Sequence, residues 1–233
     1  MRLVHASALA AAIALLIPVV NAAPQPQDPD RKVAGGGITV PGWMGAIDDA
    51  AAQKGMSIKD SKFEQMGADL HGTIGPAAIY WNPKNTASGD YMVSATFTDL
   101  KPGSAGHPHP AGLFIGGTNL DSPKKTLVYC TVYSNGNVLV RGFSEGTVFT
   151  LTPGRAGVAN AAVKQPGADG TSVNTVAWQV KGGRAECLVN GTSVAGYNKD
   201  EIVGAGKLGS LDGVYGIRVS HNMDVKISGL AKK

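Results

Sequence analysis

The stretch Leu127–Phe143, LVYCTVYSNGNVLVRGF, decides the fold class because it contains two strand patterns and the turn between them. In its first half, apolar residues alternate with tyrosine and threonine, the period of two typical of a strand with one buried face. The dipeptide Asn135-Gly136 tolerates the positive φ angles of a tight hairpin turn. A second alternation follows, so the stretch predicts a β-hairpin.

Similar short runs recur from Phe63 to Leu230, separated by glycine, proline or asparagine turns. We count about thirteen such runs, which is typical of a sandwich or barrel. The chain has 32 glycines, which suits many tight turns. One short helix is expected between Asp48 and Lys54, with Asp48 as its cap and Gly55 at its end. The sequence therefore predicts an all-β protein with little helix.

Three stretches resemble the concanavalin A-like sandwiches. They are Thr175–Gly183 (TVAWQVKGG) with its continuation LVNG, Gly213–Asn222 (GVYGIRVSHN), and the strand after Gly89-Asp90-Tyr91. The resemblance spans roughly residues 72–230. Over this range the chain is similar to the laminin-G and 3-keto-disaccharide hydrolase-like group of exported bacterial proteins. It implies a jelly roll of two curved antiparallel sheets, with a carbohydrate site on the concave face or its rim.

The N-terminus has the order of a secretory signal: basic Arg2, an apolar run over residues 8–20, and small residues up to Ala23. We predict a signal peptide over residues 1–22, a flexible tether over 23–37, and a single β-sandwich domain over 38–233. The run is shorter than the roughly 20 residues that span a bilayer. These features predict a periplasmic or extracellular protein without a membrane span after cleavage.

The net charge is +4, and the basic residues are scattered rather than gathered in one stripe. Nucleic-acid binding normally shows such a stripe, so no nucleic-acid partner is expected. The sequence leaves the oligomeric state open.

The two cysteines, Cys130 and Cys187, fall on the apolar faces of their predicted strands. In an oxidising compartment they could form a disulfide, which the chain-entropy model values at about 4 kcal/mol. Two buried free thiols are the alternative, and the sequence does not choose between them.

Outward-facing residues of several predicted strands form the candidate sugar site. Tyr129 and Tyr133 alternate with the inward residues of their strand, and sugar rings stack on aromatic faces. Arginine and glutamine side chains are suitable donors to sugar hydroxyls or a uronate. The expected carbohydrate-binding residues are Tyr129, Tyr133, Arg141, Arg218 and Gln179. Packing across the sheet surface explains the tyrosines equally well.

The loop Gly106-His107-Pro108-His109-Pro110 is the most unusual local feature. Two histidines could ligate a metal, but zinc needs at least one more ligand, and His71, His221 or Asp69 would have to supply it. We therefore expect a rim loop of the binding face, with no metal and no cofactor.

The leading hypothesis is a secreted, lectin-like protein with a carbohydrate ligand. A glycoside hydrolase of the 3-keto-disaccharide type is the first alternative, with His107, His109 and Glu186 as candidate acid and base groups. Glu186 also fits a solvated charge paired across its hairpin. A structural or accessory envelope protein is the second alternative. Whether the protein is an enzyme stays open, because no complete catalytic motif is present.

Overall fold

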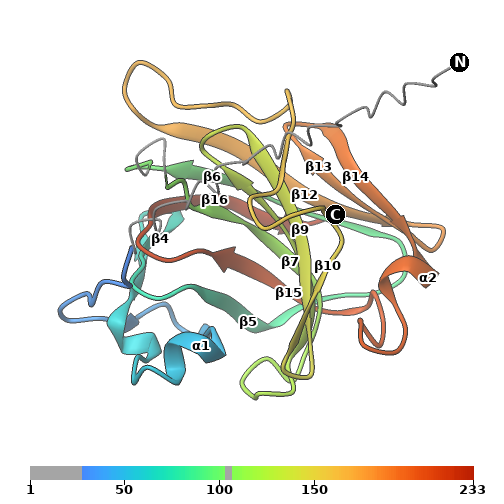
Figure 1. The fold of residues 1–233 in the computed structure, drawn as a ribbon, viewed down its shortest axis with the longest axis horizontal. Helices are drawn as coiled ribbons and strands as arrows, with labels where there is room; N and C mark the ends of the chain where they lie inside the picture. Colours follow the sequence, from blue (N-terminus) through green and yellow to red (C-terminus); the bar gives the residue numbers. More distant parts are fainter. Residues whose placement is uncertain (1–27, 103–106) are drawn as a thin grey trace, which may run out of the picture.

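Two eight-stranded sheets pack face to face in the structure, a computed structural model that describes residues 28–102 and 107–233 (Figure 1). The β6 sheet has the order β1 (Gly37–Ile38), β3 (Lys62–Met66), β4 (Asp69–Thr73), β16 (Asp224–Lys232), β6 (Tyr91–Asp99), β12 (Ser172–Lys181), β13 (Arg184–Val189), β14 (Thr192–Asn198). The β8 sheet has the order β10 (Thr147–Thr150), β9 (Asn137–Ser144), β8 (Thr126–Tyr133), β7 (Pro110–Thr118), β15 (Gly213–Val219), β5 (Ala78–Ala87), β2 (Met44–Ile47), with β11 (Val158–Ala159) paired to β9. All of these strand pairs except β1 and β3 are antiparallel, which confirms the predicted two-sheet jelly roll.

The core lies between the sheets and follows the alternation read from the sequence. Val128, Cys130 and Val132 of β8 are buried in it, and so are Ala185 and Cys187 of β13. Cys130 and Cys187 form a disulfide that joins the two sheets, with their Cα atoms 6.2 Å apart. The sequence left open a disulfide or two buried free thiols, and the structure has the disulfide.

A second apolar cluster covers the outer face of the β8 sheet, opposite the core. Tyr129 and Leu139 belong to it, as does Trp81 of β5, whereas Trp178 lies in the main core. Both faces of the β8 sheet bury apolar side chains, so part of its outer face is also shielded from solvent.

Helix is confined to α1 (Asp49–Ala52), α2 (Lys199–Ile202) and a single 3₁₀ turn (Ile58–Asp60) within the described ranges. None of these helices is long and apolar enough to cross a membrane. The Asp48 side chain makes no hydrogen bond to the start of α1, contrary to the expected cap. It binds a strand of the β8 sheet instead, as described below.

The predicted signal peptide, residues 1–22, lies outside the described residues, and the predicted tether is described only from Asp28 onward. That part is hydrogen-bonded to the sandwich: the Arg31 guanidinium donates to the carbonyls of Ile74 (2.8 Å) and Met223 (2.6 Å). Val33 and Gly37 donate backbone bonds to the 3₁₀ turn and the residue after it. Residues 28–37 are therefore attached to the sandwich, whereas we had expected a free tether there.

Strand β5 contains an Asn82-Pro83 pair, a dipeptide typical of turns, and yet runs on to Ala87. The register of β15 against β5 shifts between Val214 and Gly216, so residues 82–85 of β5 form a bulge opposite the single residue Tyr215 of β15. A proline is tolerated at such a place because no regular ladder bond is required there.

Candidate functional site

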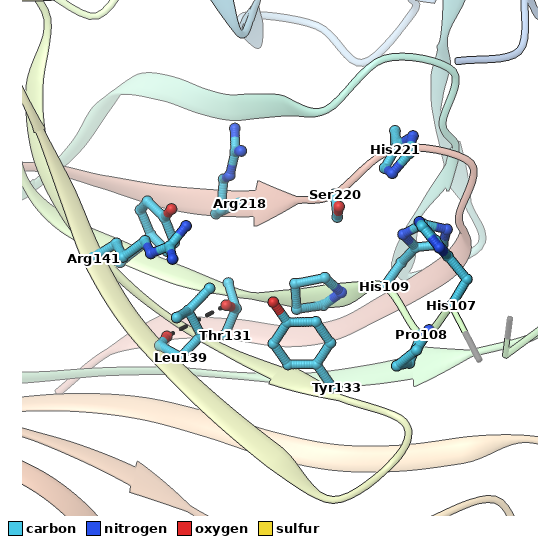
Figure 2. Close-up of a pocket in the computed structure, with 12 residues that line it drawn as sticks. His107, Pro108, His109, Thr131, Tyr133, Leu139, Arg141, Arg218, Ser220 and His221 are labelled. Carbon is cyan, nitrogen blue, oxygen red and sulfur yellow. Dashed lines mark hydrogen bonds between the residues drawn. The ribbon is translucent and has the colours of Figure 1, made fainter. Parts of the chain in front are cut away.

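A pocket of about 240 Å³ opens on the outer face of the β8 sheet, and we call it the outer pocket (Figure 2). It is built from alternate residues of β8, β9 and β15 and from the loop before β7. Its lining residues are His107, Pro108, His109, Pro110, Tyr129, Thr131, Tyr133, Leu139, Arg141, Arg218, Ser220 and His221. Strand alternation explains the set, since the neighbours of these residues in β8 and β9 point into the core.

Four of the five expected sugar-binding residues meet in this pocket, namely Tyr129, Tyr133, Arg141 and Arg218. Gln179 does not, because it lies on β12 of the other sheet, where it pairs with Met92 and with Glu186. The alternation was predicted correctly for its strand, but the sequence did not show that β12 and β8 belong to different sheets.

Glu186 is likewise separated from the histidines with which it was grouped as an acid or base. It lies on β13 of the β6 sheet, and its Oε1 is 3.0 Å from Nε of Arg184 on the same strand. Both side chains are exposed to solvent to a considerable degree. This geometry fits the solvated charge pair, and the structure does not assemble the three-residue catalytic set.

The two tyrosines have different surroundings. Tyr129 is 6 % exposed, with its ring 5.8 Å from the ring of Phe143, so it offers little surface to a ligand. Tyr133 is half-buried, and its hydroxyl donates to the carbonyl of Arg155 at 3.2 Å. Burial raises the pKa of both phenols, which keeps them protonated. The expected pair of stacking rings is therefore reduced to one accessible ring, Tyr133.

Arg218 is held as one partner of a buried ion pair. Its Nη2 donates to Oδ2 of Asp48 at 2.7 Å, and its Nη1 donates to the other carboxylate oxygen. Burial alone would lower the pKa of the guanidinium, but Asp48 raises it above its ordinary value. The charge also lies 5.3 Å from the ring of Tyr129. Arg218 thus forms part of the pocket wall and has two of its donor groups already engaged.

Arg141 differs in having a donor to spare. Its Nη2 donates to the carbonyl of Gly154 at 3.0 Å, while its Nε is buried and finds no hydrogen-bond partner in the described structure. Buried donors without a partner are rare in native proteins and call for an explanation. Arg141 thus has donor groups that no acceptor of the described chain uses, and its side chain lines the outer pocket.

Three imidazoles gather at the opposite end of the pocket from Arg141 (Figure 2). The ring centroids of His109 and His221 are 4.3 Å apart, and those of His107 and His109 are 5.0 Å apart. Asp28 completes the group: its Oδ2 lies 2.9 Å from Nε2 of His109 and 3.8 Å from Nε2 of His107. We call Asp28, His107, His109 and His221 the histidine cluster.

Burial and the contact between His109 and Asp28 shift the pKa of each residue in opposite directions. Burial lowers the pKa of His109, and the neighbouring His221 charge acts in the same direction, although Asp28 works against both. Burial would raise the pKa of Asp28, but the hydrogen bond and charge of His109 bring it below its ordinary value. At neutral pH the pair is therefore an Asp28 carboxylate that accepts a hydrogen bond from a neutral His109.

A zinc site at the two loop histidines needs at least one more ligand, and of the three candidates His221 lies beside them. The other two candidates are engaged elsewhere: His71 Nε2 lies 2.7 Å from Asp224, and Asp69 lies 3.8 Å from the amine of Lys226. Asp28 was missed because it was assigned to the tether. The expectation of no metal site, which rested on an incomplete ligand set, has thus lost its basis.

No protein-family model matches the sequence, and no curated protein matches it. The two curved sheets define a concanavalin A-like jelly roll, and solved structures share it. One is the carbohydrate-binding module CBM66 from Bacillus subtilis, with a TM-score of 0.54 and 10% identity over 85% of this chain and 99% of that chain. Another is a Bacillus subtilis protein of unknown function with a galectin-like fold, with a TM-score of 0.53 and 13% identity over 82% and 88% of the two chains. At such identities the likeness shows the fold alone.

Proposed function

We propose that the protein is a secreted, lectin-like carbohydrate-binding protein and that the outer pocket holds one sugar unit. The observation that carries this proposal is the Arg141 guanidinium, which makes one hydrogen bond within the described chain and lines a small pocket with the accessible ring of Tyr133. The volume of about 240 Å³ is below the roughly 300–1,000 Å³ of pockets for drug-sized ligands, so a single ring is the size that fits.

The lining supplies the interactions that a sugar requires. The Tyr133 ring can pack against the apolar face of a pyranose, and the Arg141 guanidinium can bind its hydroxyl groups. Arginine also pairs with carboxylates through two parallel bonds, so a uronic acid would satisfy Arg141 best. One of the solved structures with this fold is described as a carbohydrate-binding module, which agrees with the proposal.

The hydrolase alternative receives no support from the described lining. Glycoside hydrolysis normally uses a pair of carboxylates that flank the bond to be cleaved. The lining residues of the outer pocket include no aspartate or glutamate, and Glu186 lies on the other sheet. For the export part of the proposal, the disulfide between Cys130 and Cys187 is the supporting observation, because such bridges persist in oxidising compartments.

A glycan array that includes neutral and uronate-containing saccharides tests the proposal. We expect the wild type to bind a defined subset, and Tyr133→Ala and Arg141→Lys to lose at least about tenfold in affinity, or about 1.4 kcal/mol. Tyr197→Ala and Arg184→Lys change the same residue types on the β6 sheet and serve as matched controls.

Two outcomes would count against a sugar site in the outer pocket. The first is a wild type that binds no glycan, which would favour the structural or accessory alternative. The second is binding that both pocket variants retain in full, which would move the site to another surface.

A further inference from the structure

The histidine cluster joins three segments that are distant in the sequence: the start of the described chain, the loop before β7 and the residue after Ser220. One nitrogen or oxygen from each of its four residues lies within 4.8 Å of every other. We propose that Asp28, His107, His109 and His221 bind a divalent first-row transition-metal ion, and that Zn²⁺ is the ion that this donor set fits.

The distances between the donors are close to those of a metal site. Four ligand atoms at about 2.0–2.1 Å from a tetrahedral Zn²⁺ are about 3.3 Å from one another. The separations of Asp28 Oδ2 from His109 Nε2 (2.9 Å) and from His107 Nε2 (3.8 Å) bracket that value. No two of the four donor atoms are more than 4.8 Å apart, so closing any gap to the value for zinc requires a movement of at most about 1.5 Å, which side-chain rotation can supply.

The chemistry of the donors selects the class of ion. Imidazole nitrogens suit zinc, copper and nickel, whereas calcium and magnesium prefer sites made of oxygen atoms. Metal binding needs a free nitrogen lone pair, so the Nε2 proton that His109 donates to Asp28 must move to Nδ1 or be released. The Asp28 carboxylate that accepted this hydrogen bond would then become a ligand.

Neighbouring side chains contact the proposed ligands and orient them toward one another. His221 Nδ1 lies 2.8 Å from Oδ1 of Asp30, which leaves Nε2 as the nitrogen of His221 that is available to a metal ion. Asp28 accepts a hydrogen bond from Nδ2 of Asn222 at 2.9 Å through Oδ1, which leaves Oδ2 toward the histidines. Such carboxylate and amide partners fix the orientation of metal ligands.

A simple hydrogen-bond network accounts for less of this arrangement. It explains the contact between Asp28 and His109, but His107 has a 44 % exposed side chain and reaches Asp28 only at 3.8 Å. Nothing in such a network requires His107 to point at the other two rings. A shared metal ion gives all four residues one role.

The test is zinc stoichiometry and affinity in protein purified without a histidine tag, stripped with a chelator and then titrated with Zn²⁺ against a chromogenic zinc chelator. We expect about one zinc per chain for the wild type and for His71→Ala, a matched histidine outside the cluster. His107→Ala and Asp28→Asn should each weaken binding at least tenfold, and Asp30→Asn should weaken it 10- to 100-fold because it removes the carboxylate charge beside His221. Visible absorption after Co²⁺ substitution reports nitrogen-rich, tetrahedral coordination independently.

The variants are chosen so that loss of folding does not imitate loss of the site. His107 is exposed, Asp28→Asn preserves the shape of the side chain, and near-ultraviolet circular dichroism checks each variant against the wild type. Zinc below about a tenth of an equivalent at micromolar concentrations would overturn the proposal, as would equal affinity in the wild type and in both ligand variants.

Discussion

Replacing Asp48 by asparagine tests how the wall of the outer pocket is held. The wild-type carboxylate accepts two hydrogen bonds from Arg218, one of them at 2.7 Å. Arg218 is 8 % exposed, so its charge has little access to water once its partner is lost. Removing one partner of a buried ion pair typically costs about 3–5 kcal/mol.

Local features set the expected loss near the lower end of that range. The side chain of Asp48 is 29 % exposed, so water can partly replace it. The rings of Tyr129 and Phe143, 5.3 and 5.4 Å from the guanidinium carbon, contribute about 1 kcal/mol of cation–π attraction that remains. We expect Asp48→Asn to lower the free energy of unfolding by about 3 kcal/mol, or Tm by about 6–12 °C. Asp48 makes no side-chain bond to α1, so no helix cap is lost.

Urea unfolding at pH 7 measures this loss. Glu186→Gln removes one charge from an exposed pair and should cost no more than about 1 kcal/mol, which makes it the matched control. The double change Asp48→Leu with Arg218→Met should be much closer to the wild type than Asp48→Asn, since it leaves no buried charge. A loss for Asp48→Asn as small as that of the control would refute the reasoning.

Two further predictions concern stability. Cys130→Ala with Cys187→Ala removes a disulfide that spans 57 residues and should lower the free energy of unfolding by about 4 kcal/mol. Reductant should destabilise the wild type but not this variant. Two free thiols in the denatured wild type would contradict the prediction. Asp99 is 8 % exposed, and burial raises its pKa to about 6 against about 3.9 in the unfolded chain, even though the amide of Lys101 lowers it. Its carboxylate therefore destabilises the fold above pH 6, and this penalty disappears as the pH falls toward 4. Asp99→Asn should be more stable than the wild type by about 2–3 kcal/mol at pH 7.5 and equal to it near pH 4, and a stability difference that does not vary with pH would contradict this.

Strand alternation and turn chemistry were sufficient to predict an all-β sandwich or barrel, and the two-sheet jelly roll followed from the family resemblance. The inward positions of β8 and β13 and the hairpin at Asn135-Gly136 are local properties, and each is visible within a few residues. The short strands β1, β2 and β11 were missed because two to four residues contain too little periodicity to distinguish a strand from a loop.

The candidate site was only partly predictable because its members come from separate elements. Tyr129, Tyr133 and Arg141 lie on one hairpin, so their common face followed from alternation. Gln179 shares that alternation but not that sheet, and sheet membership depends on pairing between distant strands. The role of Asp28 was hidden for the same reason, since its partner Asn222 lies 194 residues further along the chain.

The pairing of β7 with β15 connects the two ends of the outer pocket. Val219 lies opposite Ala111, and the amide of Ser220 donates to the carbonyl of Pro110, so the loop histidines and His221 must be neighbours whenever these strands pair. The same strand β15 carries Arg218, whose side chain donates to Asp48, the residue after β2. A change in the strand therefore acts on the histidine cluster and on the pocket wall together. Because β15 lies between β7 and β5 in the interior of its sheet, the strand fixes Arg218 directly and fixes where the loops that carry the three histidines begin and end.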